Sequence, residues 1–406
     1  MQDRAKNTAA FILLSLILAS CGSLEAARLP DELPPAAETA APHEEEPHEE
    51  EPRYLSIVAA GDNLFHETIV AAFNEKEGYN FAPVYETIKP VIEGADLAFI
   101  NQETVLGRES FGYSGYPRFN TPRILAQNLA DAGFDIINQA NNHIMDMGEA
   151  GVMDTIAAWD AVPGTVYLGI HRSPEEREGR HIIIEKNGIR VGFLAYTYGT
   201  NGLPLPGDKP YLVSLIERET MSREIGALRP LCDFLIVSMH WGEEYAPSPS
   251  AGQTALAEFL ASREVDLVIG HHPHVLQPAA FLPRPGGGQM LCFYSLGNFM
   301  SSQRQASTML GGLMYVKLSK SGGNTALSGA GLIPVVTHYE PGPTGYRVYP
   351  LYQYSGDILK KHRLHQGGTG LNAADFYSVL NKLNIKIIMY NPFNKKTVQK
   401  RGLAGP

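Results

Sequence analysis

Residues 266–278 read DLVIGHHPHVLQP, a short apolar run followed by three histidines within four positions. The run has the length and the composition of a buried β-strand. His271, His272 and His274 follow it directly. An imidazole is costly to bury without hydrogen-bond partners, so three neighbouring rings are poor packing material. Two interpretations stay open at this point: a polar loop whose histidines are neighbours by chance, or a ligand cluster at a strand end.

Other strand-like runs end in the same kind of residue. They cover residues 54–60, 96–100, 134–140 and 233–240. The polar residues at the five strand ends are Asp62, Asn101, Glu103, Asn142, His143, His240, His272 and His274. Open α/β sheets gather ligand-binding groups beyond the carboxyl ends of their strands. Histidine together with carboxylate suits zinc, manganese, iron or cobalt, and a set of this size is enough for two ions.

Helix-like segments alternate with these runs. Residues 121–133 and 250–264 carry apolar side chains at spacings of three and four, and they begin with Thr121 and Ser250 as candidate N-caps. Residues 181–196 predict a β-hairpin with a tight turn at Asn187 and Gly188, and residues 290–350 are rich in β-formers. The alternation predicts a layered α/β domain with a mixed sheet or two packed sheets.

Six stretches carry a resemblance to a known family. They read AAGDNLFH, INQET, QANNHIMDMGEAGVMDT, SMHWGEEY, GHHPHVLQP and YSLGNF. Their order resembles the calcineurin-like metallophosphoesterase superfamily and, within it, the bacterial CapA or PgsA poly-γ-glutamate capsule-synthesis proteins. The resemblance covers residues 55–351. It implies a layered, metallophosphatase-like α/β/β/α sandwich whose site is formed by loops at strand carboxyl ends, with two divalent metal ions (Mn, Fe, Zn or Co).

The resemblance also implies which residues hold these metals: Asp62, Glu103, Asn142, His240, His272 and His274. Two positions depart from the superfamily pattern. Leu64 stands where a histidine is expected, so His66 is a ligand only if a helical first turn brings it to the side of Asp62. Glu103 replaces the usual bridging aspartate and is longer by one methylene group.

Three residues are implied to be catalytic. Asn142 would also contact a phosphoryl oxygen, and His143 would protonate or orient a leaving group. Asp146 would orient His143, with a helix N-cap as an equal alternative. Four further residues are expected to contact the substrate or to support the ligands: Asn101, His271, Glu244 and Asn298. The alternative is a structural role for His271, a solvated loop position for Glu244 and a turn after a strand for Asn298.

The first residues predict export and a membrane anchor. Arg4 and Lys6 precede a short apolar run, residues 9–19, which fits the core of a signal peptide. Residues 18–21 read LASC and resemble a bacterial lipobox, which implies that Cys21 is lipidated. An ordinary cleaved signal with an incidental cysteine is the alternative. We therefore expect a bacterial lipoprotein that is anchored to a membrane outside the cytoplasm.

Composition divides the chain into four parts. They are a signal peptide at 1–20, an acidic Pro/Ala/Glu tether at 21–53, a globular domain at 54–352 and a poorly defined C-terminal extension at 353–406. The tether carries most of the net charge of −10. No basic stripe is present, so nucleic acid is not an expected partner. Cys232 and Cys292 flank apolar runs, and we expect two buried free thiols rather than a disulfide.

Two functions follow, from different classes. The first is a dimetal hydrolase of the phosphoesterase type, because a pair of ions lowers the pKa of a bridging water. No serine or cysteine nucleophile motif, P-loop or dinucleotide fingerprint competes with it. The second, implied by the resemblance, is metal-dependent binding or anchoring of an anionic surface polymer without cleavage. Membrane-bound components of a polymer synthase are expected partners in either case. A divergent protein that has lost its metals is a third interpretation.

Overall fold

The computed structural model describes residues 51–393, except residues 77, 343 and 369. The predicted signal peptide, the lipidation site at Cys21 and nearly all of the tether lie outside the described residues. Every helix within the described range is too short or too polar to traverse a bilayer.

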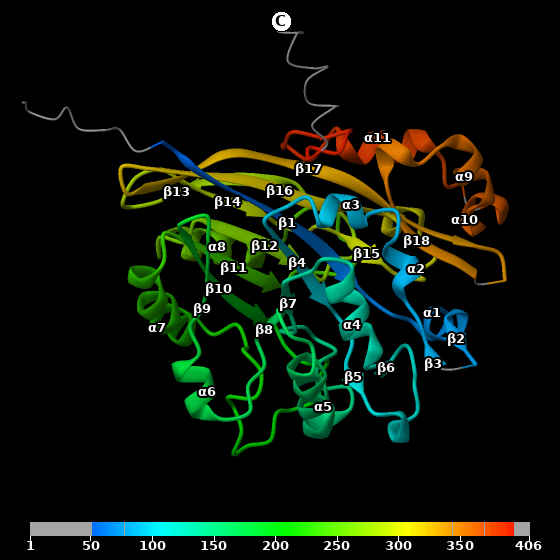
Figure 1. Ribbon diagram of the computed structural model, residues 1–406, viewed down its shortest axis with the longest axis horizontal. Helices are drawn as coiled ribbons and strands as arrows, with labels where there is room; N and C mark the ends of the chain where they lie inside the picture. The colour runs from blue at the N-terminus through cyan, green and yellow to red at the C-terminus, as the bar shows by residue number, and fades with distance from the viewer. Residues whose placement is uncertain (1–50, 77, 343, 369, 394–406) are drawn as a thin grey trace, which may run out of the picture. The chain divides into compact units, whose positions relative to one another are not determined.

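The larger of two main sheets has eight strands (Figure 1). Seven of them follow the order β18-β17-β16-β1-β4-β7-β8, and β15 pairs with the end of β1. Strands β1, β4, β7 and β8 run parallel, so their carboxyl ends lie at one edge. The strands are β1 (Arg53–Asn63), β4 (Leu97–Gln102), β7 (Ile136–Asn138), β8 (Val166–Leu168), β15 (Asn298–Met300), β16 (Leu310–Ser321), β17 (Asn324–Glu340) and β18 (Thr344–Pro350).

The second sheet has six strands in the order β13-β14-β12-β11-β10-β9. Strands β10, β11, β12 and β14 are parallel, and antiparallel β9 and β13 close the two edges. The predicted hairpin turn between β9 and β10 is present, with φ of 53° at Asn187 and 71° at Gly188. The strands are β9 (Ile182–Lys186), β10 (Ile189–Thr197), β11 (Phe234–His240), β12 (Leu267–His271), β13 (Ala279–Pro283) and β14 (Gln289–Phe293).

Helices and two short ladders complete the described structure. The ladders pair β2 (Asn74–Glu75) with β3 (Gly78–Tyr79) and β5 (Leu106–Gly107) with β6 (Thr121–Pro122). The α-helices are α1 (Glu67–Ala72), α2 (Ala82–Tyr85), α3 (Lys89–Ile92), α4 (Ile124–Asp131), α5 (Gly148–Asp160), α6 (Pro174–Gly179), α7 (Arg218–Leu228), α8 (Ala251–Ala261), α9 (Gly356–Lys361), α10 (Arg363–Gln366) and α11 (Ala373–Leu380).

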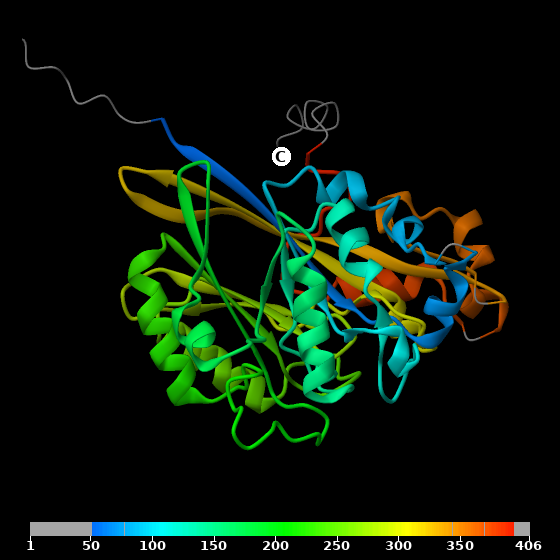
Figure 2. The same cartoon turned by 60° about the horizontal axis from the view of Figure 1, so that its bottom comes forward.

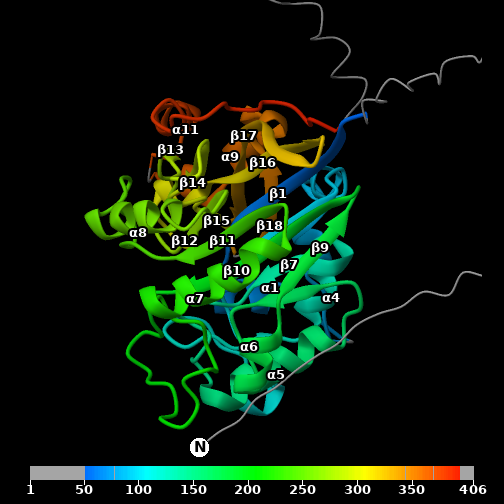
Figure 3. The ribbon, with the colours of Figure 1, turned by 90° about the vertical axis from the view of Figure 1, so that its left-hand side faces the viewer.

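Strand β11 shows why the sheets stack as layers. Phe234 and Ile236 belong to the main core, whereas Leu235 and Val237 belong to a second apolar cluster with α7 and α8. Alternate residues of a strand face opposite sides, so the six-stranded sheet meets the larger sheet on one side and these helices on the other. Figure 3 shows α7, β10 and β1 in this succession.

Helices α4 and α5 lie side by side beside the larger sheet (Figure 2), and their apolar residues join the main core. These layers confirm the predicted α/β/β/α sandwich. Ser250 caps α8 in a capping box with Gln253, as expected. The N-cap predicted at Thr121 is wrong, since α4 starts after Arg123 and the Thr121 hydroxyl instead lies 2.8 Å from that of Thr104.

The described part of the predicted C-terminal extension is attached to the core. Leu364, Phe376 and Ile388 belong to the main apolar cluster, and the Ile388 N–H donates to the carbonyl of Leu332 in β17 at 2.8 Å. The domain boundary at residue 352 stays a prediction. The two cysteines that the structure describes, at 232 and 292, are buried and free, which confirms that expectation.

Candidate metal centre

The strand ends of both sheets converge on one site. In the larger sheet, Asp62 at the end of β1 lies opposite Asn101 of β4 and Asn298 of β15. In the other sheet, His240 at the end of β11 lies opposite His271 of β12. All of these strands run parallel, which is why residues far apart in the chain reach the same edge.

Two glycines allow the chain to approach this edge closely. A Cβ atom added at Gly61 would lie 1.9 Å from the carbonyl oxygen of Gly297, and one at Gly270 would lie 2.0 Å from that of Tyr294. These glycines directly precede Asp62 and His271. They are therefore required for packing, and they fix where both side chains emerge.

Asp62 receives several donors inside the protein. It is fully buried and accepts hydrogen bonds from Asn101 Nδ2 at 2.8 Å, from the backbone N–H of His272 at 3.2 Å and from His274 Nδ1 at 3.1 Å. His271 Nδ1 lies 3.4 Å from its other oxygen. Burial raises the pKa of the Asp62 carboxyl, but the contacts with His271 and His274 outweigh it and hold that pKa well below its usual range. Asp62 is an ionised ligand candidate.

Glu103 is a buried carboxyl with an unsatisfied oxygen. Its Oε1 has no hydrogen-bond partner among the described residues, although His240 Nε2 lies 3.5 Å and His274 Nε2 3.7 Å away. Burial, followed by the charge of Asp62, raises the pKa of Glu103 well above its usual range. An unpaired buried carboxylate is strongly destabilising, and a cation between it and the imidazoles would remove that cost.

The histidines are held in the form that binds metals. Burial is the main cause that lowers the pKa of His272 to about 3 and that of His240 well below its usual range. Both rings are therefore neutral near pH 7, as metal ligation requires. Their Nδ1 atoms have no hydrogen-bond partner in the part of the chain that the structure describes.

The backbone around the site adopts rare conformations. Of seven described non-glycine residues with positive φ, four lie here, namely Asn201, Tyr245, His272 and His274, the last two at 96° and 59°. Left-handed backbone conformations are strained for residues with side chains of this size, and they persist where the surroundings enforce them. The positive φ angles of His272 and His274 turn the predicted H-x-H pair toward the ligands of the other sheet.

These contacts bring together three overlapping groups that could hold a metal ion. Within each group the ligand atoms lie within 4.8 Å of one another. The groups are Glu103, His240 and His272; Asp62, Glu103 and His274; and Glu244, His272 and His274. The donor set and the orphaned buried atoms therefore fit a divalent transition metal. Five of the predicted ligands are united here, and Glu244, expected to play a supporting role, offers a sixth ligand atom.

His66 belongs to none of these groups. It precedes α1, and its Nδ1 lies 3.1 Å from the carbonyl oxygen of Leu64. Burial is the first cause that lowers the pKa of His66 to about 4. His66 lines the cleft beside the metal groups, so the structure places it near them without joining it to one.

Of the three residues expected to be catalytic, Asn142 contacts a ligand candidate, whereas His143 and Asp146 contact each other. Asn142 Oδ1 lies 2.8 Å from His240 Nε2. His143 Nδ1 lies 2.8 Å from Asp146 Oδ2, which also accepts the backbone N–H of Phe119 at 2.7 Å. The N-cap of α5 is Met147, so the alternative of Asp146 as an N-cap is wrong. The Asp146 contact assigns the Nδ1 hydrogen and leaves His143 Nε2 for other chemistry.

Two of the expected supporting residues differ in how close they come. His271 stacks on Phe99, with ring centroids 5.9 Å apart, besides contacting Asp62. Asn298 instead directs its amide to Gln303 Oε1 and the carbonyl of Thr308, at 2.8 and 3.1 Å. Asn298 therefore holds the loop after β15 at the border of the site.

The contribution of β10 was not predicted from the sequence. After this strand, Asn201 Oδ1 accepts from Asn142 Nδ2 at 3.1 Å and from the Tyr198 hydroxyl at 3.2 Å. The Tyr198 ring lies over that of His272, with centroids 4.7 Å apart. Residues 197–201 contain no histidine or carboxylate. The signal available in the sequence was therefore their position at the end of a strand.

A cleft with a volume of about 480 Å³ opens beside these residues. It is lined by His66, His143, Glu244 and His274 together with aromatic residues, and Arg304 is its one arginine among the described lining residues. Tyr116 at the cleft is 78% exposed, so an extended ligand has an aromatic surface to contact as it enters.

Comparison with known proteins gives several relatives, two of which are named for capsule or PGA biosynthesis. The chain is 28% identical over 277 residues to the capsule biosynthesis protein CapA of Bacillus anthracis, covering 66% of this chain and 65% of that protein. It is 27% identical over 242 residues to the PGA biosynthesis protein CapA of Bacillus subtilis, covering 59% and 62%. The chain thus spans less than two thirds of the length of these relatives.

A solved structure, the calcineurin-like phosphoesterase YfkN of Bacillus subtilis, is similar with a TM-score of 0.43 and 16% identity, covering 81% of this chain and 100% of that chain. Residues 56–303 match the family described as bacterial capsule synthesis protein PGA_cap. This match covers more than half of the chain, so the chain belongs to the bacterial capsule synthesis protein PGA_cap family.

Proposed function

We propose that this protein is a metal-dependent hydrolase that cleaves a phosphoester or a related bond in an anionic molecule during capsule production. One observation carries the proposal. Buried carboxylates and neutral imidazoles from both sheets meet within metal-ligand distance. Beside them, His143 lines a cleft and contacts Asp146, which lies behind it.

The residues divide the chemistry among themselves. Divalent ions, when bound by the Asp62, Glu103 and histidine set, supply Lewis acidity and a water of lowered pKa. The Nδ1–H of His143 donates to Asp146, so its Nε2 can take up a proton from solvent and pass that proton to a leaving group in the cleft. The Asn142 amide is held by Asn201 at 3.1 Å and can orient a substrate oxygen.

The relatives support the biological setting of this proposal. Both are named for capsule or PGA biosynthesis. We place this protein at the outer side of a membrane, anchored through lipid on Cys21 and close to membrane-bound polymer synthase components. The LASC stretch and the acidic tether support this placement. Replacing Cys21→Ser should release the exported protein into the soluble fraction, and a variant that stays in the membrane would refute the lipid anchor.

The test of the hydrolase combines metal analysis with turnover. The purified full chain is loaded with Mn, Fe, Zn or Co, dialysed and analysed for bound metal. Hydrolysis of an aryl phosphodiester and an aryl phosphomonoester is then followed. His272→Ala and Glu103→Gln should lose both metal and turnover, whereas the exposed His181→Ala serves as a matched control and should keep both. Far-ultraviolet circular dichroism checks that each variant is folded.

The outcomes separate the two functional classes. Metal with turnover that depends on His272 supports a phosphoesterase. Bound metal without turnover, together with metal-dependent retention of a polyanion such as poly-γ-glutamate, supports binding or anchoring instead. A folded wild type that retains no metal after loading refutes both.

A further inference from the structure

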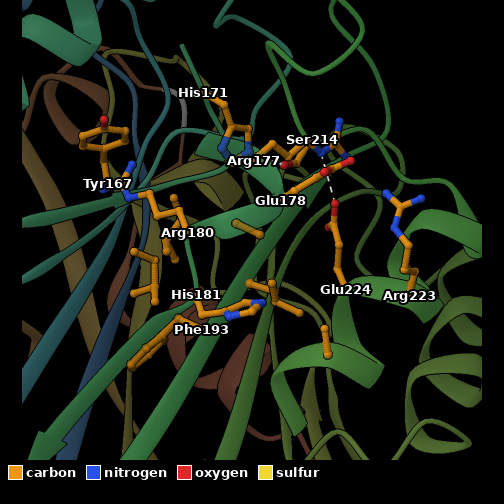
Figure 4. Close-up of a pocket in the computed structure, with 16 residues that line it drawn as sticks. Tyr167, His171, Arg177, Glu178, Arg180, His181, Phe193, Ser214, Arg223 and Glu224 are labelled. Carbon is orange, nitrogen blue, oxygen red and sulfur yellow. Dashed lines mark hydrogen bonds and ion pairs between the residues drawn. The ribbon is translucent and has the colours of Figure 1, made fainter. Parts of the chain in front are cut away.

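A second cavity lies away from the metal groups, between strands β8 and β10 and helices α6 and α7. It has a volume of about 380 Å³ and is shown in Figure 4. This volume falls within the range of small-molecule sites in proteins. None of its lining residues belongs to the candidate metal centre. The hydrolase proposal leaves this cavity without a role.

The cavity has an apolar floor and a polar rim. Leu168, Phe193 and Ala195 are buried at its floor, and they come from strands of both sheets. Arg223 and His181 are exposed at its rim. A ligand that fits both zones needs an apolar body inside and a polar group near the opening.

Arginines give the cavity a positive bias. Three arginines line it, Arg177, Arg180 and Arg223, against two glutamates. One glutamate, Glu224, is already neutralised, because Arg177 Nε lies 3.0 Å from its Oε1 and the Tyr196 hydroxyl donates to its Oε2 at 2.7 Å.

Two of the guanidinium groups are held in place before any ligand binds. Arg180 stacks on Tyr167, with its Cζ atom 3.9 Å from the ring centroid, and its Nη1 donates to Glu176 Oε1 at 3.3 Å. Arg177 Nη1 donates to the carbonyl of Pro210 at 3.2 Å, while its Nη2 has no partner among the described residues. A pre-oriented guanidinium with spare donors is suited to a planar or tetrahedral anion.

A half-buried histidine, His171, lines the cavity and is affected by the charges of the same arginines. His171 Nε2 lies 3.0 Å from the Ser214 hydroxyl. Burial, followed by the charges of Arg177 and Arg180, lowers the pKa of His171 to about 3. The ring is therefore neutral near pH 7, and it adds a polar contact without adding charge.

We propose that this cavity binds a small molecule with an apolar body and a single carboxylate or phosphate group. The apolar body packs on Leu168, Phe193 and Ala195, and the anion lies against the spare Nη2 of Arg177 and against Arg223. A cationic head group has no matching partner beside Arg177, since Glu224 is already paired there. The two anion chemistries share this recognition, and the experiment separates them.

The experiment uses ligands that differ in the head group alone. Octanoate, octyl phosphate, octanol and octylamine are titrated into the purified full chain by isothermal calorimetry. At least one of the two anions should bind, with octanol and octylamine about tenfold weaker or more. The tighter anion identifies whether a carboxylate or a phosphate is preferred.

Matched variants locate the site. Arg177→Gln combined with Arg223→Gln should weaken binding of the preferred anion about tenfold or more. Arg218→Gln is the control, because Arg218 lies on the same helix α7 but outside the cavity, over the ring of Phe259. His272→Ala should bind the anion as the wild type does, so failure of the hydrolase proposal is distinguishable from failure of this one.

Three results would overturn the proposal. They are octanol binding as tightly as the preferred anion, no binding of either anion, or unchanged binding by the folded double variant. Thermal unfolding of the double variant against Arg218→Gln shows that a loss of binding is not a loss of folding.

Discussion

Replacing Glu103→Gln should stabilise the metal-free protein, although Glu103 is central to the site. Its Oε1 is buried without a hydrogen-bond partner in the described structure, and the ionised Asp62 lies nearby. The histidine nitrogens nearest to Oε1 belong to His240 and His274, at 3.5 and 3.7 Å, and the first of these rings is neutral near pH 7. A neutral amide of almost the same shape replaces a group whose ionisation is opposed by burial and by Asp62, and it adds an N–H donor that can face His274 Nε2.

The magnitude follows from the cost of one unsatisfied buried group. Removing it should raise the free energy of unfolding by about 1–3 kcal/mol in the presence of a chelator. With bound metal, the wild type should instead be more stable than Glu103→Gln. A ligand at a hundred times its dissociation constant stabilises the folded state by about 2.7 kcal/mol, and the variant, lacking a ligand oxygen, should gain little of this.

The assay is urea unfolding followed by circular dichroism, once with EDTA and once with excess manganese. Asp266→Asn is the control, because Asp266 is a half-buried carboxylate with good partners, Arg229, Arg284 and the Leu235 N–H. This control should be less stable than the wild type in both conditions. If Glu103→Gln is destabilised in EDTA as the control is, Glu103 is satisfied without metal and the reasoning is wrong.

The remaining predictions concern the pair of His143 and Asp146, the packing and the thiols. Asp146→Asn should slow phosphodiester turnover about 10–100-fold while bound metal stays unchanged, and a parallel loss of metal would mean a purely structural role. Gly270→Ala should destabilise the fold by more than about 2 kcal/mol, measured by urea unfolding, because the new Cβ would lie 2.0 Å from the Tyr294 carbonyl oxygen; near wild-type stability would contradict that contact. Cys232 and Cys292 should resist a thiol reagent until urea unfolds the chain, since burial raises the pKa of both thiols, and rapid reaction in native buffer would show an open core.

Much of the site could be predicted because the ends of the strands can be recognised in the sequence. Asp62, Glu103 and His240 each follow an apolar run, and parallel strands bring such ends together. The contribution of β10 could not be read in the same way. Tyr198 and Asn201 act through a tilted ring contact and an amide, which are common in ordinary loops.

The local geometry of the histidine cluster also escaped the sequence pattern. Strand alternation would place His271 and His272 on opposite faces, but β12 ends at His271 and the positive φ of His272 changes the direction of the chain. The C-terminal segment escaped for another reason. Its helices are short, and it is held by contacts such as that of Ile388 with Leu332, whose partners are distant in sequence.

The separation between the two halves of the metal centre has a consequence for how the protein matures. Asp62 and the backbone of His272 are 210 residues apart in the chain and meet only after both sheets have formed and docked. A contact of such range is slow to form and expensive in loop-closure entropy. A bound ion would act as a reversible cross-link over that loop and would slow the separation of the sheets. Metal supply would then set the lifetime of the folded protein, and a chelator would shorten that lifetime.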